Sequence, residues 1–125
     1  MKSGCGDEQP RMSDLQRRCE ARARTLDAAL RQFVAAVRTM SGVHAIYVFG
    51  SFAEGNVGPY SDLDLLVVRE TALTGPERGA DLVIEAKLDI PCDLVVVTPS
   101  EYRDRLPNTS FGRTILASAR MAHAA

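Results

Sequence analysis

The chain lacks several features that would assign it to common protein classes. It has no basic surplus, because its 15 Lys and Arg face 16 Asp and Glu, whereas a domain that binds nucleic acid usually shows one. It has no apolar run long enough to cross a bilayer. Residues 1–10 lack the apolar core of a signal peptide. We therefore expect a cytoplasmic protein that does not act at a membrane, with nucleic acid a disfavoured partner.

Cysteine and histidine are too few and too scattered for a disulfide framework or a zinc site. Cys5, Cys19 and Cys92 are odd in number and widely spaced, which favours free thiols in a reducing compartment. His44 and His123 lie far apart, and no His/Cys cluster has zinc spacing. A metal site in this chain would therefore have to consist of carboxylates.

What is present suits a single α/β domain. The chain has 125 residues, of which 46% are hydrophobic, enough for a core without staples. Residues 1–12 are predicted to be a flexible tail and residues 13–125 one domain, without internal repeats.

Capping boxes predict where the helices start. Ser13 and Gln16 open the first helix, Thr74 and Glu77 a later one, and Thr98 with Glu101 a short one near the C-terminal end. Gly42 is expected to end the first helix in a left-handed conformation, and its arginine-rich first half, 14–24, can extend beyond the core. The predicted apolar faces are Leu26, Leu30, Phe33, Val34 and Val37 in the first helix, Ala80, Val83, Ile84 and Leu88 before Pro91, and Phe111, Ile115, Leu116 and Ala119 after Pro107.

Three β-branched and apolar runs, 44–49, 63–68 and 92–97, predict strands. The run 63–68 is nearly all apolar and is therefore expected at the centre of the sheet. Together with the helices, these runs predict a small mixed sheet of three or more strands with helices packed on it.

Residues typical of phosphate and metal chemistry lie at the ends of these strands. Gly50-Ser51 stands where a strand turns into a short helix, whose free N–H groups suit phosphate oxygens. Asp62 and Asp64 are two apart at a strand start, so both carboxylates point to one face while Leu63 points into the core. If the strand that begins near Asp93 is adjacent, a third carboxylate joins them.

Three such carboxylates would suit hard divalent cations such as Mg²⁺, which often share their oxygen ligands with a substrate phosphate. Two ions held this way could clamp the attacking and leaving oxygens of an in-line phosphoryl displacement.

Each feature also has a simpler interpretation. A Gly-Ser pair is usually a turn, an Asp-x-Asp at a strand start is usually a solvated edge, and Asp93 could face water. Cys92 is better explained as a small buried residue than as a nucleophile. Tyr60 and Phe52 either pack or stack on a base, and the arginines between 11 and 38 form either a solvated face or a docking surface for an acidic partner. The joint occurrence of the first three features, in this order, favours a functional site.

The segments Gly50-Ser51-Phe52-Ala53-Glu54-Gly55 and Ser61-Asp62-Leu63-Asp64-Leu65 resemble the signature of the DNA polymerase beta-type nucleotidyltransferase superfamily. The resemblance covers about residues 26–120 and is greatest to the minimal nucleotidyltransferase branch, whose members are often encoded beside a HEPN-domain toxin.

The resemblance implies a role for each matching residue. It implies that Gly50, Ser51 and Ser61 bind a nucleoside triphosphate, and that Asp62 and Asp64 bind Mg²⁺. It further implies that Asp93 completes the metal site and helps to deprotonate the acceptor hydroxyl.

The implied activity is Mg²⁺-dependent transfer of a nucleoside monophosphate, AMP from ATP, onto a hydroxyl of a HEPN-type toxin, which makes the chain an antitoxin. Two alternatives stay open: a non-catalytic antitoxin that acts by binding, and a small-molecule enzyme of the aminoglycoside-modifying type. Position 54, often basic in the family, is Glu54 here, which disfavours a triphosphate. No second helical domain follows, so the acceptor surface is expected from a partner or from a second copy in an oligomer.

Overall fold

A four-stranded mixed sheet organises the computed structural model, which describes residues 13–124. The strand order is β4 (Cys92–Val97), β3 (Leu63–Arg69), β2 (Val43–Phe49) and β5 (Arg120–Ala124). β2 runs antiparallel to both β3 and β5, whereas β3 and β4 are parallel. The predicted mixed sheet is therefore confirmed, with the most apolar strand, β3, in a central position.

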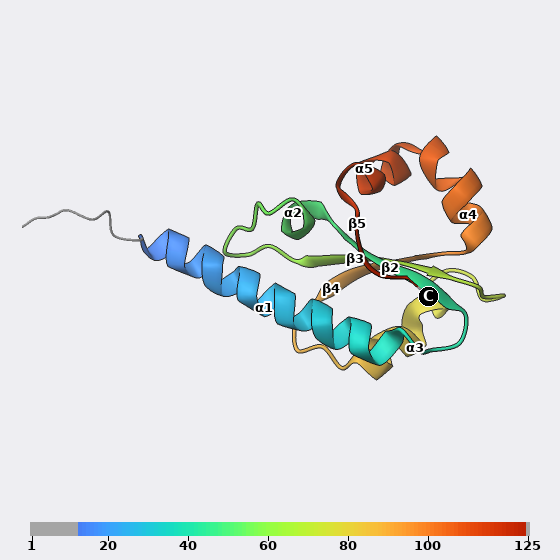
Figure 1. Cartoon of the computed structure of the whole chain (residues 1–125), viewed down its shortest axis with the longest axis horizontal. Coiled ribbons are helices and arrows are strands. Elements are labelled where there is room, and N and C mark those ends of the chain that lie inside the picture. The colour runs from blue at the N-terminus through green and yellow to red at the C-terminus, as the bar shows by residue number, and fades with distance from the viewer. Residues whose placement is uncertain (1–12, 125) are drawn as a thin grey trace, which may run out of the picture.

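Helices cover both faces of this sheet (Figure 1). The long α1 (Asp14–Val37) and α3 (Glu77–Ala86) lie on one side, and α4 (Pro99–Asp104) and α5 (Ser110–Ser118) lie on the other. A 3-10 turn, η1 (Leu106–Asn108), joins α4 to α5, and the four-residue α2 (Gly50–Ala53) follows β2 directly. Within residues 13–124, no helix combines the length and the apolar character that a membrane span requires.

The first helix begins as predicted and ends earlier. Ser13 and Gln16 form both hydrogen bonds of a capping box, and four of the five predicted core positions are buried, while Val34 is half-buried. The helix stops at Val37, so the prediction that Gly42 ends it is wrong. Gly42 has φ +80° in the turn before β2, where a Cβ atom would lie 2.3 Å from the carbonyl oxygen of Glu70. The missing side chain therefore lets this turn pack against the backbone at the end of β3.

The predicted start of α3 is wrong, and so is its predicted buried face except for Leu88, which lies just past the helix and packs half-buried against the core. Pro76 occupies the N-cap position in a helical conformation without a side-chain cap, because Gly75, at φ +61°, turns the chain there. Val83 and Ile84 are 50% and 71% exposed, and Ala80 is exposed as well. The buried positions are instead Gly79, Leu82 and Ala86.

Close packing and ion pairs explain this rotation of α3. A Cβ atom on Gly79 would lie 2.8 Å from Leu94 Cδ2 and 3.2 Å from Val96 Cγ2, so the missing side chain lets the helix pack closely on β4. On the adjacent turn, Asp81 accepts two hydrogen bonds, at 2.7 and 2.8 Å, from the buried Arg69. The periodicity of apolar residues predicts neither of these contacts.

The C-terminal region contains a strand that the sequence analysis missed. The prediction that Phe111 and Ala119 lie on the buried face of the last helix is wrong, because Phe111 is 61% exposed and Ala119 follows the helix. Ile115 is buried and Leu116 half-buried, as predicted. The chain then returns as β5, an edge strand whose residues are exposed or half-buried, so the sequence carries no clear alternation there.

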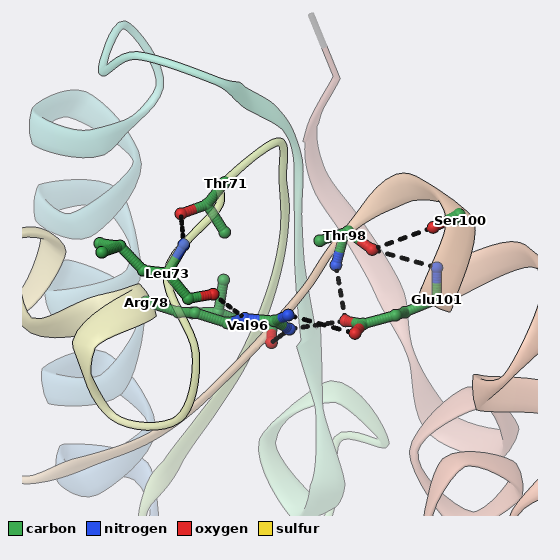
Figure 2. Close-up of polar contacts among 7 residues, drawn as sticks. All are labelled: Thr71, Leu73, Arg78, Val96, Thr98, Ser100 and Glu101. Carbon is green, nitrogen blue, oxygen red and sulfur yellow. Dashed lines mark hydrogen bonds and ion pairs between the residues drawn. The ribbon is translucent and has the colours of Figure 1, made fainter.

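Arg78 links α3 to the start of α4 on the far side of β4 (Figure 2). Its guanidinium donates two hydrogen bonds to the Glu101 carboxylate, at 2.6 and 3.2 Å, and one to the Leu73 carbonyl. Glu101 also accepts from the Thr98 N–H, which closes the predicted capping box of α4. The bonds from Arg78, followed by that from the Thr98 N–H, lower the pKa of Glu101 from its ordinary value to about 2.

Replacing Glu101 with Gln should therefore lower the stability in a pH-dependent way. The amide keeps the capping geometry and removes the charge, at a cost of about 1 kcal/mol at pH 7 after allowance for solvent screening. Because the folded pKa is depressed, the contribution is present above the unfolded pKa of about 4.3 and fades as the pH falls toward 2. Urea unfolding of both proteins at pH 7 and pH 3 measures this. An equal difference at both pH values would contradict the prediction.

Candidate functional site

The predicted site residues come together at one end of the sheet. β2 ends there, whereas β3 and β4 begin there, and the strand register pairs Phe49 with Asp64 and Asp64 with Asp93. Residues paired in this way share a face. The predicted adjacency of the strands that begin near Asp64 and Asp93 is therefore confirmed, and their carboxylates lie side by side.

Asp64 is the carboxylate most strongly affected by this arrangement. Burial, followed by the charge of Asp93, a hydrogen bond to Asp93 and the charge of Asp62, raises the pKa of Asp64 to about 6. All of these effects disfavour a second negative charge in a confined space. The three carboxylates therefore interact electrostatically, as their spacing in the sequence predicted.

Asp62 lies at the rim of the site, in the loop just before β3. Its side chain is 57% exposed, and its Oδ1 is 3.8 Å from Nη2 of Arg22 on α1. Nε of Arg22 donates a 2.8 Å hydrogen bond to the carbonyl oxygen of Ser61. The N-terminal half of the long helix thus reaches the site through one arginine.

Gly50 allows the turn into α2 to approach Asp64 closely. Its φ is +78°, and a Cβ atom built on it would lie 2.3 Å from Asp64 Oδ2. The Gly50 N–H donates to the Ser118 hydroxyl, at 2.9 Å, on α5. One of the backbone donors expected to serve a phosphate therefore has an internal partner in this structure.

The two serines of the motif bond to each other. Ser51 donates to the Ser61 hydroxyl at 3.2 Å, and the same oxygen accepts from the Gly58 N–H at 2.8 Å. This network connects α2 to the loop that leads into Asp62. It explains why Ser51 and Ser61, ten residues apart, belong to one site.

The donor set fits a hard divalent cation. Within residues 13–124, no three His, Cys, Asp or Glu side chains form a preorganised metal cage. Mg²⁺ seldom uses such a cage, because it usually takes one or two carboxylates and completes its shell with water and substrate phosphate. Asp64 and Asp93, where burial and then repulsion raise the pKa of Asp64, have this character together with the solvent-exposed Asp62.

The sequence analysis missed two residues of this region, Arg22 and Ser118. Both act through partners 39 and 68 residues away in the sequence, so no local motif marks them. Of the other candidates, Cys92 is half-buried, and burial and its acidic neighbours raise its pKa, which fits its interpretation as a structural residue. Tyr60 is 81% exposed, and Phe52 lies under Arg120, whose Cζ is 5.8 Å from the ring centroid.

A pair of glycine variants separates backbone strain from site geometry. Gly50 and Gly55 both have positive φ, but a Cβ on Gly55 meets nothing within 4 Å. Gly50→Ala and Gly55→Ala should each cost about 1 kcal/mol of stability. Only Gly50→Ala should displace the Asp64 carboxylate and weaken Mn²⁺ binding, by roughly tenfold or more. Mn²⁺ titration followed by electron paramagnetic resonance measures this, and equal affinities would contradict the assignment.

Comparisons with known proteins identify the family and the fold of the chain. The sequence profile of the family described as "Nucleotidyltransferase domain" matches residues 30–117. No curated protein sequence matched the chain. A solved structure from Sulfolobus solfataricus, provisionally assigned as a nucleotidyltransferase, is 18% identical, with a TM-score of 0.58 over 86% of each chain.

Two weaker structural matches are a mutant of the toxin-antitoxin pair MntA-HpeT and a toxin-antitoxin with AMP-PNP. The first is 18% identical over 79% of this chain and 72% of that chain, with a TM-score of 0.49. The second is 20% identical over 82% and 73%, with a TM-score of 0.48. The Sulfolobus match shows a shared fold, to which the weaker two add nothing. By the profile match, which spans most of its length, the chain belongs to the nucleotidyltransferase domain family.

Proposed function

We propose that the protein transfers a nucleoside monophosphate, AMP from ATP, onto a hydroxyl group of a partner protein. The carboxylates of Asp62, Asp64 and Asp93 carry this proposal. The strand register places Asp64 beside Asp93 at the end of the sheet where Gly50 begins α2, and the charge of Asp62 acts on Asp64 from the preceding loop. The family match supports a transferase. The donor, the acceptor and the roles of the individual residues go beyond that match.

The reaction forms a bond between the acceptor oxygen and the α-phosphorus and breaks the bond from that phosphorus to the pyrophosphate oxygen. The acceptor proton passes to a carboxylate, for which we propose Asp93, the more exposed member of the Asp64–Asp93 pair. Asp62, Asp64 and Asp93 would hold Mg²⁺, which when bound neutralises charge on the phosphates. Gly50, Ser51 and Ser61 would hold the triphosphate after exchanging internal hydrogen bonds for phosphate oxygens.

The partner is proposed from the sequence motifs. Gly50–Gly55 and Ser61–Leu65 resemble the minimal branch of the family, for which a HEPN-type toxin is the expected acceptor. A cytoplasmic location follows from the same proposal and agrees with the free thiols of Cys19 and Cys92.

Asp64→Asn should abolish the transfer. The protein is incubated with Mg²⁺, α-labelled ATP and the product of the adjacent reading frame, and the label on that product is counted. Loss of one central electrostatic group should lower the rate by roughly a hundredfold or more. Asp89→Asn is the matched control, because Asp89 is an exposed aspartate in the loop before β4, and it should leave the rate unchanged.

The alternatives are distinguished when the labelling assay is extended with Asp64→Ala, an added aminoglycoside and a measurement of the partner's toxicity. Neutralisation of the partner that survives Asp64→Ala, without any label, would mean that the protein acts by binding alone. Label that appears on an added aminoglycoside, with the protein left unlabelled, would identify a small-molecule enzyme. Either result would refute the proposed acceptor.

A further inference from the structure

Arg22 is held at the carboxylate end of the sheet although it lies outside the core. The first fully buried residue of α1 is Leu26, and the preceding part of the helix extends past the loop that precedes β3 (Figure 1). The Arg22 side chain is nevertheless only 22% exposed, compared with 80% for Arg31 further along the same helix. Its guanidinium contacts Ser61 and Asp62, which hold the side chain against the loop before β3.

These contacts orient the guanidinium but use only part of its hydrogen-bond donors. Nε donates to the Ser61 carbonyl at 2.8 Å. The 3.8 Å separation between Nη2 and Asp62 Oδ1 exceeds a hydrogen bond. An arginine has five N–H donors, so most of them stay available in the described part of the chain. An ordered side chain with spare donors binds a further anion at a small entropic cost.

The negative charge of the site favours a cation beside a bound phosphate. Three carboxylates at one end of the sheet repel a triphosphate. Among the ion pairs of residues 13–124, the Arg22–Asp62 contact is the one that reaches a site carboxylate. Arg120 lies over the ring of Phe52 in α2. Guanidinium groups also bind phosphate with two parallel hydrogen bonds, which a lysine does not offer.

We propose that the Arg22 guanidinium binds a phosphate group of the donor nucleoside triphosphate, in place of its long contact with Asp62. This inference rests on the proposed function, because it assigns a phosphate ligand to the same site. It gives the triphosphate a cation from α1, a helix outside the two sequence motifs, and so explains why the projecting half of that helix is tied to the loop before β3.

The simpler alternative is that Arg22 only stabilises the Ser61–Asp62 loop. The two roles predict different effects of losing Arg22 on the affinity for a metal ion alone. Loss of a brace would disorder Asp62 and weaken binding of a metal ion alone and of nucleotide together. Loss of a phosphate ligand removes a positive charge beside Asp62, so the metal ion alone should bind as well as before or more tightly, while the triphosphate binds more weakly.

The experiment compares Arg22→Gln and Arg22→Lys with Arg24→Gln, an exposed arginine two residues away, in the full chain. Mn²⁺ affinity without nucleotide is measured by electron paramagnetic resonance, and the affinity for ATP with Mg²⁺ by calorimetry. We expect Arg22→Gln to weaken ATP binding by roughly tenfold to a hundredfold without weakening Mn²⁺ binding. Arg22→Lys should be intermediate and Arg24→Gln like the unmodified protein.

Two results would overturn the inference: unchanged ATP affinity in Arg22→Gln, or a parallel loss of ATP and Mn²⁺ affinity. If Arg22→Gln does not fold, Arg22→Lys decides by the same criteria, because it keeps the charge and loses the paired donors. Failure of the proposed function looks different. In that case the unmodified protein would not bind ATP, or Asp64→Asn would bind it equally well, and this inference would fall with it.

Discussion

The parallel pairing of β3 with β4 places Asp64 directly opposite Asp93, and the character of the site depends on this one constraint. Neighbouring strands lie about 4.8 Å apart, so the two carboxylates cannot avoid each other without breaking the register. Burial, and after it the charge of Asp93, raises the pKa of Asp64 to about 6. The apolar side chains of β3, which are buried along the rest of the strand, fix the register against this repulsion. The fold thus holds together negative charges that would separate in a free chain, and this arrangement favours the binding of a cation at that position.

Residues from α2, α5 and α1 surround this pair of carboxylates. Gly50 brings the turn into α2 within van der Waals reach of Asp64 because it has no Cβ. Ser118 on α5 accepts a hydrogen bond from the Gly50 N–H in that turn. Arg22 on α1 donates a hydrogen bond to the Ser61 carbonyl in the loop before β3. α2 and α5 pack together on one side of the sheet, and α1 runs along the other side (Figure 1). The geometry of the site is a property of the whole domain and does not belong to the two short motifs alone.

Much of the fold and of the site was predictable from the sequence, for a physical reason. The β-branched runs and the Asp-x-Asp spacing report local periodicity, and the strand at 92–97 and the capping boxes of α1 and α4 were confirmed. The failures share another cause. The buried face of α3 is set by Gly79 against Leu94 and by the Arg69–Asp81 pair, and β5 forms through pairing with β2. Arg22 and Ser118 likewise reach the site through contacts distant in sequence. The adjacency of Asp93 was an inference until the sheet order confirmed it.

The central claim is that Asp62, Asp64 and Asp93 form a divalent-metal site that receives a nucleoside triphosphate. The most direct measurement is a crystal structure of the protein with Mn²⁺ and a non-hydrolysable ATP analogue, with the metal located by its anomalous scattering. The account predicts anomalous density within about 2.0–2.3 Å of oxygens of Asp62, Asp64 and Asp93, with the phosphates of the analogue adjacent to it. A metal ion bound elsewhere, or a nucleotide that binds away from these carboxylates, would contradict it.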